Sequence, residues 1–267
     1  LLRAGVAERM YGAMVKWMSW IPGGLMHSNI GACTLFAATS GSSVATAATV
    51  GTVALPLVER YGYNERLFLG TLAAGGTLGI LIPPSINLII YAVLTDTSIP
   101  KLYLAGIVPG LAMAASFMGL VAALCMLRPG WGGQRAHFSW AERFASLVHL
   151  LPPIGIFLVV VGSIYAGLAT PTEAAALGVV AALALAWAYG RLSLRMLREV
   201  FENSMRTTAM VMLIIVAAYF LNFVISAIGL TAMLTGFISG LGLSKFQTLL
   251  VVVLFYLVLG CFMETLS

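Results

Sequence analysis

The stretches SGSS, residues 40–43, and GTLGILIPPS, residues 76–85, decide the fold of this chain. Each puts small polar residues and helix breakers inside a long apolar run, residues 29–57 and 67–94. Unpaired backbone amides and carbonyls in hydrocarbon cost several kcal/mol each, so broken helices at bilayer depth are tolerated only where they are buried in protein or line a cavity. The two stretches are therefore candidate binding sites of a membrane protein.

The composition predicts an all-α polytopic membrane protein. Hydrophobic residues make up 61% of the 267 positions, charged residues 9%, and the mean hydropathy is +1.02. Soluble domains carry roughly 25% charged residues. The lipid bilayer is the expected surrounding, and no basic tail points to a nucleic-acid partner. The chain lacks an initiator Met and stops directly after an apolar run, which favours a fragment truncated at both ends.

Hydropathy, with charges and Gly or Pro as boundaries, predicts the membrane spans. They cover roughly residues 67–95, 101–127, 144–169, 171–190 and 207–229. Residues 1–20 and 193–206 mix charged with large apolar side chains, which is typical of amphipathic helices in the membrane interface. The TPTE stretch, residues 170–173, predicts a capping box that starts a helix.

Residues 27–59 are expected to form a re-entrant hairpin with residues 40–43 at its tip. As one straight helix they would reach about 50 Å, against a hydrocarbon core of ~30 Å. The positive-inside rule agrees with the hairpin. It puts the basic residues of 1–16 on the same side as the arginines of 128–143 and 191–206, which is expected to be cytoplasmic.

The end of the chain predicts a weak internal repeat. A Gly-rich segment leads into FQTLLVVVLFYLVLGCFMETLS, residues 246–267, so an apolar arm again precedes a small and polar break. An odd number of crossings separates the two units and makes them inverted. Inverted repeats with discontinuous helices that meet at the midplane are typical of secondary transporters.

Several runs in this order resemble the large membrane subunit of TRAP (tripartite ATP-independent periplasmic) transporters. They are SGSSVATAATVGTVALP at 40–56, GTLAAGGTLGILIPPS at 70–85, IIYAVLTDTSIPKLYLAGIVPGL at 89–111, TPTEAAALG at 170–178 and LVLGCFME at 257–264. The resemblance implies sodium-coupled import of a small organic acid across the bacterial inner membrane. A periplasmic binding protein and a small membrane subunit are the implied partners.

The resemblance also implies an elevator-type movement of a transport domain against a scaffold, and it divides the chain into four parts. Residues 1–26 are an interfacial arm helix, and residues 27–95 are the first hairpin with its broken helix, in the transport domain of the first repeat. Residues 96–229 are connecting transmembrane helices that include the scaffold, and residues 230–267 begin the second repeat with one arm of its hairpin.

Sodium needs several oxygen ligands and no particular side chain, so carbonyls freed at a break and Ser or Thr hydroxyls suffice. The predicted sodium ligands are Ser40, Ser43, Thr77, Gly79, Ile82 and Pro84, with Gly79 and Ile82 contributing carbonyl oxygens only. The alternative is that these small residues merely allow close helix packing. Neither another metal nor a cofactor is predicted.

Half-helices that begin at the breaks would point amide donors at a substrate carboxylate. The predicted substrate ligands are Ser42, Ser85, Asn87 and Glu264. Glu264 is the only acid deep in an apolar run, and such a residue is functional by default. The family usually has Asp near this position, so the geometry of Glu264 differs by one methylene. The alternative for Glu264 is a place at an interface created by truncation.

Other functions remain as alternatives. An ion channel would also use re-entrant hairpins, but it would need a continuous polar pore. A binding-protein-independent sodium/anion symporter of a related inverted-repeat fold would use the same breaks. An enzyme is not expected, because Ser42 has no His or Lys at plausible depth to act as base.

Overall fold

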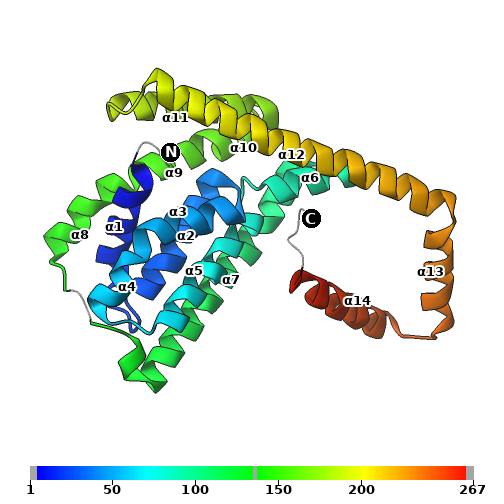
Figure 1. Cartoon of the computed structure of the whole chain (residues 1–267), viewed down its shortest axis with the longest axis horizontal. Helices are drawn as coiled ribbons and strands as arrows, with labels where there is room; N and C mark the ends of the chain where they lie inside the picture. Colours follow the sequence, from blue (N-terminus) through cyan, green and yellow to red (C-terminus); the bar gives the residue numbers. More distant parts are fainter. Residues whose placement is uncertain (1–4, 135–136, 263–267) are drawn as a thin grey trace. The chain divides into compact units, whose positions relative to one another are not determined.

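The computed structural model describes residues 5–134 and 137–262, and its regular structure in these ranges is helical (Figure 1). This confirms the prediction of an all-α protein. The chain divides into two compact units, residues 1–192 and 193–267.

The first unit contains the two predicted breaks. Its helices are α1 (Val6–Met18), α2 (Leu25–Ser40), α3 (Ser43–Ala54), α4 (Pro56–Tyr61), α5 (Glu65–Leu81), α6 (Ile86–Thr95), α7 (Ile99–Leu127), α8 (Trp140–Ser146), α9 (Leu151–Phe157), α10 (Ser163–Tyr165) and α11 (Pro171–Ala188). Short 3-10 turns cover Pro129–Trp131 and Leu147–His149, and a π-helical turn covers Leu158–Gly162.

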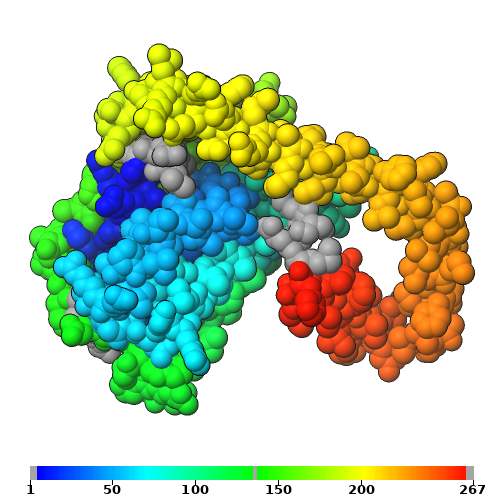
Figure 2. Space-filling model, in the orientation of Figure 1, coloured from blue at the N-terminus to red at the C-terminus, as the bar shows by residue number. Residues whose placement is uncertain are grey.

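Helix α2 is the centre of this unit. It packs against α1, α3, α5, α7 and α9 and is buried on all sides, as expected of a helix that is apolar all round. The apolar face of α1, including Met10 and Tyr11, is buried and α1 packs against α2. The space-filling view shows α3 and α4, in light blue, at the surface of the unit (Figure 2).

A buried polar network joins three helices of this core. The Tyr11 hydroxyl donates to Asn29 Oδ1 at 2.7 Å, and Asn29 Nδ2 donates to Thr71 Oγ1 at 2.9 Å. The Thr71 hydroxyl donates in turn to the Phe68 carbonyl at 2.7 Å. Because each buried polar group has a partner, the network fixes the register of α1, α2 and α5 instead of destabilising the core.

Glycines on α5 let α2 and α3 approach closely. A Cβ atom on Gly75 would lie 3.0 Å from the Cβ of Cys33, and one on Gly76 would lie 2.7 Å from the Cβ of Ala47. Small residues at helix interfaces serve this purpose in membrane proteins. Close packing is therefore one role of the glycines in the GTLAAGGTLG run.

The base of the hairpin is tied to the connection after α7. The Asn64 amide donates to the Trp131 carbonyl at 3.3 Å, and the Gln134 amide donates to the Tyr61 carbonyl at 2.9 Å. The Tyr63 hydroxyl accepts a hydrogen bond from the Leu25 amide at 3.1 Å. Burial raises the pKa of Tyr63 above its ordinary value.

Three predicted spans of this unit match long apolar helical segments: Glu65–Thr95, Ile99–Leu127 and Pro171–Ala188. The fourth, predicted over 144–169, is instead a bent pair, Trp140–His149 and Leu151–Tyr165, with 42° between its parts. Pro152 and Pro153 explain the bend, because they lack the amides that would continue the preceding helix.

The second unit begins with one uninterrupted helix, α12 (Leu194–Ala227). It joins the predicted interfacial helix 193–206 to the predicted span 207–229 without a break. The sequence contains neither Gly nor Pro between 194 and 227, and ion pairs Arg195–Glu199 and Arg198–Glu202 support its first turns. Helices α13 (Leu230–Gly240) and α14 (Lys245–Gly260) complete the unit.

Candidate functional site

The tip of the predicted hairpin is a two-residue break between α2 and α3. Gly41 ends α2 with a φ of 65°, in the left-handed region that favours glycine. Ser42 is extended and caps α3, where its hydroxyl accepts from the Ala45 amide at 3.3 Å. The SGSS sequence thus supplies the C′ glycine of one helix and the N-cap serine of the next.

The second break separates α5 from α6. Ile82 ends α5 in an extended conformation, the Pro83–Pro84 peptide bond is cis, and Ser85 caps α6. The buried Ser85 hydroxyl donates to the Ile80 carbonyl at 2.6 Å and accepts from the Leu88 amide at 3.5 Å. Two prolines remove the amides that a continuous helix would need here.

The two breaks lie against each other. The Ile86 amide donates to the Gly41 carbonyl at 3.2 Å. A Cβ atom on Gly41 would lie 2.5 Å from the carbonyl oxygen of Pro84, and one on Gly79 would lie 2.8 Å from the carbonyl carbon of Ser42. Helices α3 and α6 therefore both begin at one packed junction. Helix N-termini favour anions.

A chain of hydroxyl groups crosses the tip. Ser40 Oγ and Thr46 Oγ1 lie 2.9 Å apart, and the Thr46 hydroxyl donates to the Ser42 carbonyl at 2.7 Å. Thr46 is fully buried and belongs to this cluster, although it is not among the predicted ligands. Its place one turn after the N-cap serine is the signal that would have identified it, because positions four apart share a helix face.

The remaining predicted ligands differ in their surroundings. Ser43 is half-buried at the start of α3, and Asn87 is half-buried in the first turn of α6. Thr77 is exposed and donates to the Ala74 carbonyl of its own helix at 2.7 Å, so no described contact joins it to the tip. Glu264 lies outside the described residues.

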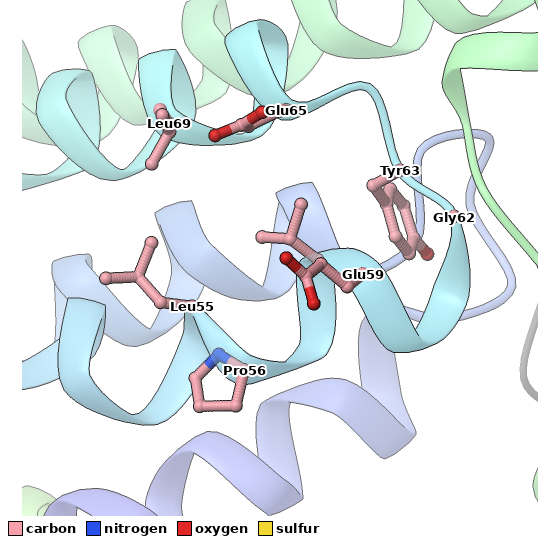
Figure 3. Close-up of a pocket in the computed structure, with 8 residues that line it drawn as sticks. Leu55, Pro56, Glu59, Gly62, Tyr63, Glu65 and Leu69 are labelled. Atoms are coloured by element: carbon pink, nitrogen blue, oxygen red, sulfur yellow. The ribbon is translucent and has the colours of Figure 1, made fainter.

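One cleft lies at the base of the hairpin, and none of the predicted ligands is among the residues that line it. Its volume is about 400 Å³, and it lies between α3–α4 and α5. Figure 3 shows Glu59 of α4 and Glu65 of α5 on its two sides. It is lined by Leu55, Pro56, Val58, Glu59, Gly62, Tyr63, Glu65 and Leu69.

The predicted capping box of the TPTE stretch is confirmed. The Thr170 hydroxyl accepts from the Glu173 amide, and Glu173 accepts from the amide and the hydroxyl of Thr170. Pro171 is the first residue of α11. The stretch starts a helix, as expected, because both side chains are used by the cap.

Comparison with known proteins gives consistent matches over the whole chain. A family model described as "Tripartite ATP-independent periplasmic transporter, DctM component" matches residues 1–267. A C4-dicarboxylate TRAP transporter large permease protein of Pseudomonas aeruginosa is 37% identical over 97% of this chain and 61% of its own length. A sialic acid TRAP transporter large permease protein of Vibrio cholerae is 33% identical over 99% of this chain and 62% of its own length.

A relative named for a different substrate also matches. An ectoine TRAP transporter large permease protein of Halomonas elongata is 33% identical over 85% of this chain and 53% of its own length. The chain thus spans about three fifths of the length of the C4-dicarboxylate and sialic acid relatives.

Proposed function

We propose that this chain is part of a sodium-coupled importer of small organic acids. The premise is that it belongs to the DctM component family of tripartite ATP-independent periplasmic (TRAP) transporters. In this proposal a periplasmic binding protein delivers the substrate, a small membrane subunit completes the transporter, and the bacterial inner membrane is its location. The relatives are transporter permeases, and no enzymatic activity is proposed for the chain.

The packed junction of the two breaks carries the proposal. There the Thr46 hydroxyl lies within hydrogen-bond distance of both the Ser40 hydroxyl and the Ser42 carbonyl. Such a cluster suits sodium, which binds oxygen ligands without requiring a charged side chain. In the proposal Ser40 of this cluster is a sodium ligand, and Ser43, Gly79, Ile82 and Pro84 supply further ligands. Thr77 does so only after its hydroxyl leaves the Ala74 carbonyl.

A carboxylate is proposed to bind next to this ion. The capped N-termini of α3 and α6 meet at the junction, and their positive dipole ends favour an anion. Ser42, Ser85 and Asn87 would add hydrogen bonds, and Glu264 would bind a hydroxyl or amine of the substrate or a second ion. Sodium and substrate charges then neutralise each other at bilayer depth, which couples their binding.

Inverted repeats and an elevator-type movement belong to the same proposal. They would let one preformed site face each side of the membrane in turn, as in other secondary transporters with broken helices.

Uptake by proteoliposomes tests the function. A complete permease that carries this sequence is reconstituted with its small subunit and supplied with labelled organic acids. The proposal expects saturable uptake that requires an inward sodium gradient and the binding protein. Large non-saturating currents would instead identify a channel, and sodium-dependent uptake without a binding protein would identify the alternative symporter.

A further inference from the structure

A second cavity, of about 300 Å³, borders the junction of the two breaks. Thr39, directly before the tip, and Pro84, in the second break, both line it. The other walls come from α6, α7, α11 and the segment Leu151–Tyr165, all within the first unit. The cavity therefore begins where the proposed carboxylate site ends.

The chemistry of the lining restricts what the cavity can hold. Ile156, Val160 and Ile164 form one wall, and Ala175, Gly178 and Ala182 of α11 form another. None of the lining residues carries a charge. A second carboxylate placed here would lose part of its hydration to the apolar walls and would find no ionic partner among the lining residues, which is unfavourable. An uncharged, largely aliphatic group would fit.

Among the mostly apolar residues that line the cavity, Tyr103 has a hydroxyl group without a hydrogen-bond partner in the described part of the chain. Its side chain is only 2% exposed, and its ring packs against Ile164 and Ala174. Yet no hydrogen bond joins its hydroxyl to any residue of the described part of the chain, and the residue lines the cavity. A tyrosine hydroxyl can donate and accept a hydrogen bond, so one without a protein partner at a cavity wall is available to a ligand. A ligand oxygen in the cavity would supply that partner.

We propose that this cavity holds the uncharged body of the substrate, with Tyr103 donating a hydrogen bond to an oxygen on it. The inference rests on the proposed function, which puts the substrate carboxylate at the adjacent junction. It narrows the substrate to monocarboxylates with a mainly aliphatic body that carries a hydroxyl or carbonyl oxygen. Pockets of this kind are mostly apolar, with a few placed polar groups.

Ligand-induced stabilisation of the purified complete permease, in the presence of sodium, measures binding without the binding protein. The probes are three acids with equal carbon number: an unsubstituted monocarboxylate, a hydroxylated monocarboxylate and a dicarboxylate. The wild type is expected to bind the hydroxylated acid best and the dicarboxylate worst. Tyr103→Phe should weaken binding of the hydroxylated acid about tenfold and leave the unsubstituted acid unchanged, because only the hydroxyl group is removed.

A larger side chain at the cavity wall gives a second, independent test of the inference. Ala182→Phe should weaken binding of longer monocarboxylates while the shortest acids still bind. The matched control is Ala184→Phe, an exposed position of the same helix that is not among the residues lining the cavity. Unchanged length preference in Ala182→Phe, or a lipid acyl chain found tightly bound in the cavity, would overturn the inference.

The inference and the proposed function fail in different ways. A wild type that takes up acids with sodium but prefers the dicarboxylate would overturn the inference alone. A wild type that takes up no acid with sodium, in the presence of the binding protein and the small subunit, would overturn the proposed function and the inference with it.

Discussion

The backbone amide of Ile86 donates a hydrogen bond to the carbonyl oxygen of Gly41, with 3.2 Å between nitrogen and oxygen. This bond joins the first turn of α6 to the tip between α2 and α3. Together with the close approach of Gly79 to Ser42, it makes the two helix breaks one packed unit. A substitution in either break should therefore affect the other.

Gly41→Ala should abolish most of the uptake. Alanine at a φ of 65° costs roughly 1–2 kcal/mol, and its Cβ would meet the Pro84 carbonyl at 2.5 Å, so the second break has to move. The measurement is initial uptake rate at equal amounts of assembled permease. Gly51→Ala is the control, because a Cβ there meets no atom within 4 Å. Equal rates in both variants would contradict the packed junction.

Gly79→Ala should raise the sodium concentration needed for half-maximal uptake several-fold. The added methyl would lie 2.8 Å from the Ser42 carbonyl carbon and would push the tip away from α5. Gly70→Ala, on the same helix with open space around it, should leave sodium activation unchanged. A normal sodium response in Gly79→Ala would show that the tip position does not matter for the ion.

Ser40→Ala and Thr46→Val test the hydroxyl chain at the tip. Each removes an oxygen from the cluster, so each should weaken sodium activation about tenfold, the effect of losing one ligand worth roughly 1.4 kcal/mol. Thr52→Val is the control on α3, because its hydroxyl donates only to the Thr49 carbonyl. If the variants lower the amount of assembled protein but leave sodium activation unchanged, these hydroxyl groups have a structural role only.

Asn29→Leu should destabilise the protein by about 2–4 kcal/mol, because the buried hydroxyls of Tyr11 and Thr71 both lose a partner. Thermal unfolding of the purified permease in detergent measures the change. Tyr11→Phe removes one hydroxyl but leaves the Asn29–Thr71 bond in place, so it should cost less. Equal and small effects would mean that water replaces the lost partners.

Local signals in the sequence predict the breaks and the helix starts well. The SGSS and IPPS stretches contain the glycine, N-cap serines and prolines that end and restart helices, and the TPTE stretch contains a complete capping box. These features depend on residues one to four positions apart. They can therefore be predicted without knowing the tertiary structure.

Tertiary contacts account for what the sequence alone did not predict. The bond between Tyr11 and Asn29 joins residues of two helices, and no local pattern marks it. The same holds for the unused hydroxyl of Tyr103, which follows from its position on α7 opposite α11. The absence of Gly and Pro is a signal for one uninterrupted α12. Hydropathy instead predicts two helices, because the first turns of α12 are charged and the rest is apolar.

Equilibrium binding of radioactive sodium to the purified complete permease tests the central claim most directly. The account predicts saturable binding in the wild type and in Thr52→Val, strengthened by an organic acid substrate, and much weaker binding in the Ser40→Ala, Thr46→Val double variant. Wild-type sodium affinity in a folded double variant would contradict the assignment of the ion to the junction of the two breaks.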